Sequence, residues 1–108
     1  MLNDLATQSG HHDSWWISFL GRTQVWARLR LLEAGTAEVF DSAGNTFPYD
    51  SEDSARSALL DADFREREGL DEGDAAELGF LLDELTPPQG DDDARLLAQM
   101  IRQPGQKA

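Results

Sequence analysis

Two histidines beside a carboxylate are the first residues of this sequence that could bind a metal or act as a base. His11, His12 and Asp13 are consecutive, and consecutive side chains on an extended chain point to opposite sides. The stretch 1–13 shows neither strand nor helix periodicity, so we expect a flexible N-terminal tail there. A tail cannot hold ligands in a fixed geometry, and we therefore predict no metal site and no cofactor.

Other catalytic sets are also missing. A serine hydrolase needs a positioned base, both histidines lie in that tail, and no glycine-rich phosphate-binding motif is present. The carboxylate pairs Asp61/Asp63 and Glu66/Glu68 lie in polar surroundings that give no reason for a raised pKa. A calcium loop starting at Asp61 would place Arg65 at a ligand position and Glu66 at the required glycine. We predict that the protein is not an enzyme.

The clearest binding feature is a row of aromatic and arginine residues on a predicted strand. Between 24 and 32 the odd positions are all apolar, whereas the even positions include Trp26, Arg28 and Arg30. If the odd side chains face the core, one sheet face presents a set of possible contact residues: Trp16, Trp26, Arg28, Arg30 and Phe40. Such a face suits single-stranded nucleic acid, but a net charge of −12 opposes a polyanion.

Two uses of this face remain open. It could bind another protein or a second copy of the chain, because tryptophan and arginine dominate interface energetics. Alternatively, a C-terminal helix at 93–102 could fold back and cover it with its own apolar side chains.

Acidic residues form the alternative binding surface. Residues 51–108 carry fifteen acids and six bases, and the acids are dense between Glu66 and Glu84. The set that we single out is Asp71, Glu72, Asp74 and Glu77. These residues could recognise a basic protein, as a DNA-mimic-like decoy or an inhibitor or immunity-type protein does, or they could form a solvated helix face.

The elements that position these residues follow from periodicity and turn signals. Short strands are expected at 14–20, 24–32, 36–41 and 45–49, joined by turns that include 21–23 and the segment around Gly44. Pro48 cannot donate to a ladder, so the last strand should lie at an edge. Together they predict a four-stranded antiparallel meander.

Helical spacing replaces the strand period after Asp50, which can cap a first helix. Asp71 begins a second helix whose apolar stripe runs to Leu85, and 87–90 ends it. We predict an α+β fold in which two helices pack on one face of the meander, followed by a C-terminal helix. The domain should span 14–86, with 87–108 forming a linker and that helix.

Composition indicates the cellular location and the class of protein that we expect. The chain has 108 residues and no cysteine, and no apolar run exceeds three residues. Membrane binding is therefore not expected, and eight arginines against one lysine are typical of a GC-rich bacterial genome. We predict a small acidic interaction or regulatory protein of the bacterial cytoplasm, with a protein partner or a self-dimer and no nucleic acid.

Overall fold

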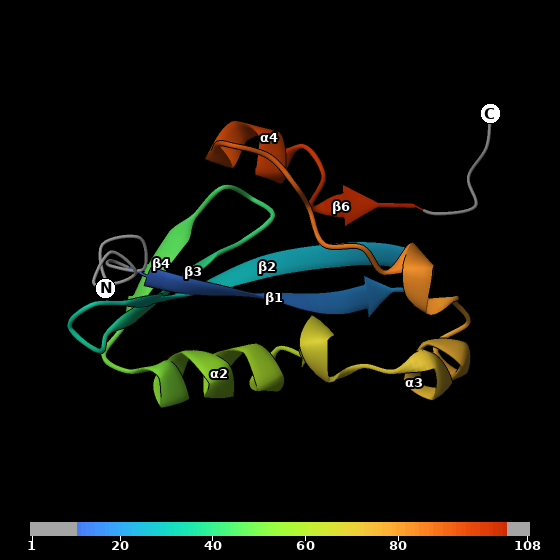
Figure 1. Ribbon diagram of the computed structural model, residues 1–108, viewed down its shortest axis with the longest axis horizontal. Coiled ribbons are helices and arrows are strands. Elements are labelled where there is room, and N and C mark those ends of the chain that lie inside the picture. The colour runs from blue at the N-terminus through green and yellow to red at the C-terminus, as the bar shows by residue number, and fades with distance from the viewer. Residues whose placement is uncertain (1–10, 104–108) are drawn as a thin grey trace, which may run out of the picture.

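An antiparallel sheet forms the centre of the protein in its computed structural model, which describes residues 11–103 (Figure 1). Four strands follow one another as a meander: β1 (His11–Leu20), β2 (Thr23–Leu32), β3 (Ala37–Phe40) and β4 (Thr46–Tyr49). Two short strands join them: β5 (Arg65–Glu66) pairs with β1, and β6 (Ile101–Arg102) pairs with the start of β2. The predicted α+β fold built on a four-stranded antiparallel meander is confirmed.

Helices supply most of the remaining regular structure within residues 11–103. They are α2 (Glu52–Asp61), α3 (Glu72–Glu77) and α4 (Asp93–Leu97), with 3₁₀ helices η1 (Arg67–Gly69) and η2 (Leu82–Glu84). Figure 1 shows α2 on one side of the sheet, and α4 with β6 on the other. Ser51, rather than Asp50, caps α2, because its hydroxyl oxygen accepts a hydrogen bond from the Ser54 backbone N–H at 3.1 Å.

The second helix is shorter than predicted. The apolar spacing indicated a helix as far as Leu85, but α3 ends at Glu77. Gly79 follows it with φ of +89°, and the Phe80 backbone N–H bonds to the Ala75 carbonyl at 2.9 Å. Glycine adopts this left-handed conformation without steric cost, so the chain reverses here and carries Phe80 into the interior.

The turn between β1 and β2 decides which side chains share a face. We expected a turn over 21–23, but Leu20 pairs with Thr23, which leaves only Gly21 and Arg22 in the turn. A turn shorter by one residue shifts the register by one position, and each such shift moves a side chain to the opposite face. As a result, Ile17 lies opposite Trp26, and Trp16 lies opposite Ala27.

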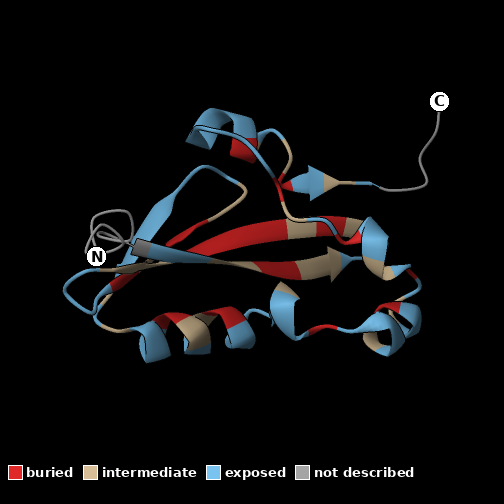
Figure 2. Cartoon of the chain, viewed as in Figure 1, coloured by how far each residue is buried: buried red, intermediate tan, exposed pale blue. Residues whose placement is uncertain are grey.

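Both faces of the sheet are consequently apolar and covered. The Ala27 face, named after its central residue, packs against α2 in a cluster of buried residues: Trp16, Ala27, Leu29, Ala37, Val39, Ala55 and Leu59. The Trp26 face packs against the later part of the chain in a second cluster: Ile17, Trp26, Phe40, Leu70, Ala75, Phe80, Leu85 and Met100. Figure 2 shows buried positions along most of β2 and on the side of α2 that faces the sheet.

The folded unit extends past both expected boundaries. Residues 11–13, which we assigned to the tail, belong to β1 and pair with 30–32 of β2, while residues 1–10 lie outside the described residues. The C-terminal helix is confined to Asp93–Leu97, and the chain then turns and continues as β6. Leu96 and Met100 of this segment are buried, so 93–102 packs onto the sheet; residues 104–108 lie outside the described part of the chain.

Candidate functional site

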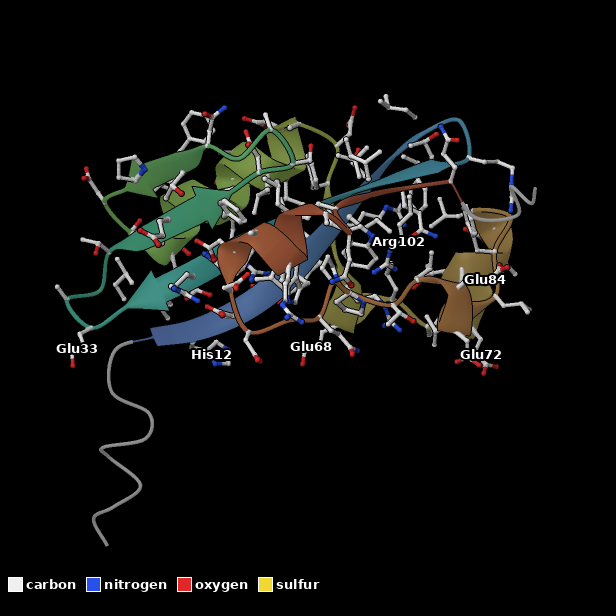
Figure 3. The ribbon with its side chains drawn as sticks, turned by 90° about the horizontal axis from the view of Figure 1, so that it is seen from above. His12, Glu33, Glu68, Glu72, Glu84 and Arg102 are labelled. Carbon is white, nitrogen blue, oxygen red and sulfur yellow. The ribbon has the colours of Figure 1, made fainter. Side chains whose placement is uncertain are left out.

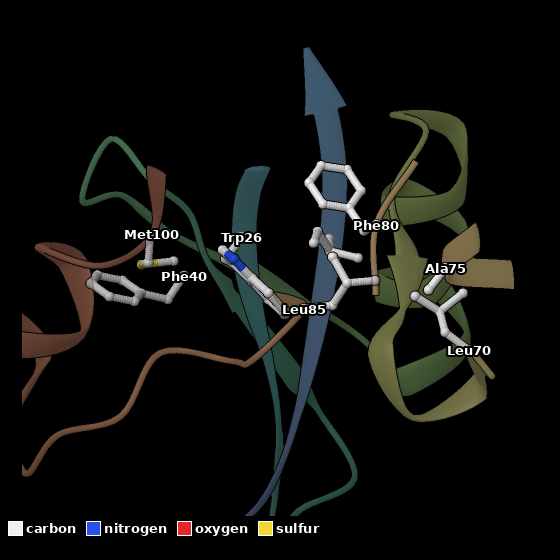
Figure 4. Packing of buried hydrophobic residues seen from close by; sticks show 8 residues of the cluster. Trp26, Phe40, Leu70, Ala75, Phe80, Leu85 and Met100 are labelled. Carbon is white, nitrogen blue, oxygen red and sulfur yellow. The ribbon is translucent and has the colours of Figure 1, made fainter. Parts of the chain in front are cut away.

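The aromatic and arginine residues predicted as a contact surface lie mainly in the interior. Trp26 is 0% exposed, Arg28 3% and Phe40 4%. Figure 4 shows Met100 beside Phe40 and Trp26 within the cluster. The proposal that these three side chains meet a partner directly is therefore wrong for the fold described, because the protein's own C-terminal segment occupies their face.

Trp16 lies on the opposite face of the sheet from Trp26 and does not belong to the same group. It is 1% exposed and packs in the cluster under α2. Its indole Nε1 donates a hydrogen bond to the Ser14 hydroxyl at 3.1 Å, and the Arg56 guanidinium lies 5.0 Å from its ring centroid. The misplacement follows from the turn length described above.

The segment 93–102 covers the Trp26 face through backbone and side-chain bonds. The backbone N–H of Trp26 donates to the Met100 carbonyl at 2.8 Å, and β6 pairs with Gln24 and Val25. The alternative in which this segment folds back over the sheet is thus the one that the structure adopts, although only its first half is helical.

Polar atoms on this face are bonded mostly within the chain. The Trp26 indole donates to the Gln24 side-chain oxygen at 3.2 Å, and the Gln24 amide donates to the Glu84 carbonyl at 3.0 Å. Arg28 donates to Asp93 at 3.1 Å and lies 4.9 Å above the Phe40 ring, but its Nε has no hydrogen-bond partner.

Arg30 is the one member of the predicted set that is not buried, and its side chain too is bonded within the protein. Its guanidinium donates to both carboxylate oxygens of Asp13, at 2.8 and 3.1 Å. The hydrogen bond to Asp13 raises the pKa of Arg30, against the opposing effect of partial burial. The arginines of this face are therefore matched to the chain's own carboxylates rather than presented to a partner.

Of the four predicted acidic contact residues, two have a structural role. Asp71 accepts a hydrogen bond from the Asp74 backbone N–H at 2.8 Å, and Asp74 accepts one from the Asp71 backbone N–H at 3.1 Å. This reciprocal capping box satisfies backbone donors at the start of α3. The positions of Asp71 and Asp74 are explained by helix capping alone.

The other two, Glu72 and Glu77, are exposed on α3. Within residues 11–103 no ion pair or hydrogen bond engages the carboxylates of Glu72, Glu77 or the nearby exposed Asp83. Figure 3 shows Glu72 and Glu84 at the same end of the molecule, far from Glu33. This end therefore carries carboxylates that form no ion pair with any of the described residues.

A groove of about 370 Å³ lies beside these carboxylates. We call it the acidic groove and define it by its lining residues: Glu72, Ala76, Phe80, Leu81, Leu82 and Asp83. Leu81 is 71% exposed although it is a large apolar residue, and its backbone N–H donates to the Glu84 carboxylate at 2.8 Å. The groove thus combines exposed apolar surface with negative charge.

The groove was not predicted from the sequence, because its residues looked like parts of one continuous helix. A helix that continued to Leu85 would carry Leu81 on its apolar stripe and bury it. The signal that could have found the groove is Gly79, since a glycine in a helical pattern often marks the C-terminal end.

An arginine of the chain already contacts the aromatic residue of this groove. The Arg22 guanidinium carbon lies 4.4 Å from the Phe80 ring centroid, and its NH1 donates to the Gly79 carbonyl at 2.8 Å. Phe80 also stacks with Phe19, with centroids 5.3 Å apart. The Phe80 ring is therefore firmly held and compatible with a guanidinium group.

Among residues 11–103, no cluster of three or more histidine, cysteine or carboxylate side chains could hold a metal ion. None of the described helices combines the length and apolar character needed to span a bilayer.

Comparison with protein-family models, curated proteins and solved structures gives no significant match.

Proposed function

We propose that this protein is a small, non-enzymatic interaction module that binds a cationic protein through the acidic groove. The observation that carries the proposal is Leu81, a leucine left 71% exposed beside carboxylates that form no ion pair with any described residue. A contiguous apolar patch within a polar rim is typical of protein contact sites, and in the groove Leu81 adjoins Phe80 and Leu82 beside the carboxylates of Glu72 and Asp83. This function corresponds to the alternative that we drew from the acidic residues.

The overall charge supports the same kind of partner. A net charge of −12 produces a negative field that attracts cationic proteins and speeds their encounter with the groove. Exposed apolar surface around Leu81 then contributes affinity at the contact itself. We further propose a bacterial cytoplasmic setting, on the compositional grounds given above.

A photo-crosslinking experiment tests this function. Benzoylphenylalanine replaces Leu81 in one variant, and Phe47, a 44% exposed residue of β4, in the control variant. Illumination in bacterial lysate should link a protein rich in lysine and arginine to position 81 and not to position 47. The yield of this crosslink should fall as the salt concentration is raised, because salt screens exposed charges.

Charge-neutralised variants complete the test. The double substitution Glu72→Gln and Glu77→Gln should remove most of the crosslink at position 81. The matched substitutions Glu33→Gln and Asp50→Asn, which also remove two exposed acids, should preserve it. Equal loss in both variants, or a crosslinked partner without excess positive charge, would contradict the proposal. Competition by duplex DNA for the captured protein would identify the decoy form of this function.

A further inference from the structure

We propose that the acidic groove receives an arginine side chain of the partner. This inference rests on the proposed function and names the group that the groove recognises. The groove offers two kinds of surface, apolar walls from Phe80, Leu81 and Leu82, and the carboxylates of Glu72 and Asp83. A ligand that satisfies both must carry a positive charge at the end of an apolar stem, which restricts the choice to arginine and lysine.

The groove is large enough to admit one long side chain. About 370 Å³ is near the lower end of the range for ligand sites, which starts at roughly 300 Å³. The groove is open at the exposed Leu81, so a side chain can enter from a partner's surface while the partner's backbone stays outside. Leu81 would contact the stem and one side of the charged group, and the carboxylates would bond to the N–H groups of that charged group.

Arginine fits the walls better than lysine. A guanidinium group is planar and weakly hydrated, so it stacks on aromatic and apolar surfaces while its N–H groups bond at the edges. An ammonium group is strongly hydrated and loses more on leaving water. Phe80 is itself buried and its ring already contacts Arg22 and Phe19, so the apolar surface left for the incoming guanidinium is mainly that of Leu81 and Leu82.

Electrostatics near the groove still favour a second cation beside Arg22. Arg22 bonds to a backbone carbonyl and has no carboxylate partner among the described residues. Arg22 therefore does not pair with the carboxylates of Glu72 and Asp83. Glu77, which lies on α3 with Glu72, adds a further negative charge. An incoming guanidinium can form charge-assisted hydrogen bonds with these carboxylates.

Peptide titrations followed by NMR test the inference on the full chain. The probes are acetyl-Gly-Arg-Gly-amide, the corresponding lysine peptide, and the citrulline peptide, which keeps the shape of arginine without its charge. We expect shift changes at the amides of 72–84 with the arginine peptide, and binding about two- to fivefold tighter than with lysine. Citrulline should produce no saturable change.

Variants make the result specific to the groove. Leu81→Ala should abolish the preference for arginine over lysine, whereas Phe47→Ala should leave it unchanged. Asp83→Asn should weaken both cationic peptides. Equal affinities of the arginine and lysine peptides, or shift changes centred outside 72–84, would overturn the arginine assignment.

The two proposals can fail separately. A cationic protein crosslinked at position 81, together with equal arginine and lysine binding, would leave the proposed function intact and remove the arginine assignment. Absence of any cationic protein at position 81, despite arginine-selective binding at 72–84, would remove the proposed function while the side-chain preference stands.

Discussion

The guanidinium of Arg28 and the carboxylate of Asp93 lie 3.1 Å apart, although 65 positions separate the two residues in the chain. The Arg28 side chain is 4% exposed and that of Asp93 63% exposed, so the pair links the interior of β2 to the surface start of α4. Asp93 is the sole carboxylate bonded to Arg28 among the described residues. The C-terminal segment therefore covers this face of the sheet and supplies the carboxylate that pairs with Arg28.

Asp93→Asn should destabilise the protein by about 1–2 kcal/mol, because a buried cation loses its charged partner. The effect stays below that of a fully buried pair since water reaches Asp93. Urea unfolding followed by tryptophan fluorescence measures it. Asp91→Asn, two residues earlier on the exposed loop, should change the free energy of unfolding by less than about 0.5 kcal/mol. Equal effects of the two substitutions would contradict the role of the pair.

Met100→Ala should destabilise the protein by about 2–5 kcal/mol, because it leaves a cavity next to Trp26 and Phe40. Met100 is 0% exposed, whereas its neighbour Ile101 is 55% exposed. Ile101→Ala should therefore cost far less in the same denaturation measurement. If Met100→Ala were as mild as Ile101→Ala, the segment 93–102 would not be packed on the sheet in solution.

The strands of the meander were predictable because period-2 alternation and turn glycines mark each of them. Which side chains of β1 share a face with those of β2 was not predictable, since this depends on whether the turn holds two residues or three. Thr23 suits either position, and a change of one residue exchanges the faces of Trp15 and Trp16 relative to Trp26. Local sequence does not decide between these registers; burial of both sheet faces does.

The burial of Arg28 was unpredictable for a different reason. An arginine on an alternating strand normally indicates the solvent face, and its compensating partner, Asp93, comes from a distant segment. The same holds for Gln24, whose side-chain amide bonds to the carbonyl of Glu84 at 3.0 Å. Such long-range partners leave no local pattern, so the sequence alone predicts an exposed surface for the aromatic and arginine residues.

Asp71→Ala should destabilise the protein by about 1 kcal/mol through loss of the α3 capping box. The adjacent substitution Glu72→Gln should leave the free energy of unfolding almost unchanged and weaken partner binding. Thermal unfolding and a binding assay on both variants separate the two roles. Comparable stability losses in the two variants would contradict the assignment of Glu72 to the contact surface.

Gly79→Ala should destabilise the protein by about 1–2 kcal/mol, because alanine at φ of +89° is strained and its Cβ would lie 3.1 Å from the Arg22 NH1. Gly69, with no atom within 4 Å of an added Cβ and no positive φ, is the control. Gly69→Ala should be neutral or slightly stabilising. Chemical denaturation of the two variants measures the cost of replacing the left-handed glycine after α3, and equal free energies of unfolding would contradict its role.

Hydrogen–deuterium exchange of the protein with and without its captured partner tests most directly whether contact is made by the acidic groove rather than by the sheet face. We predict added protection confined to 72–85, with exchange in 24–30 and 96–102 unchanged. Added protection in 24–30 accompanied by faster exchange in 96–102 would show that the C-terminal segment is displaced and that the Trp26 face binds the partner, which would contradict the account.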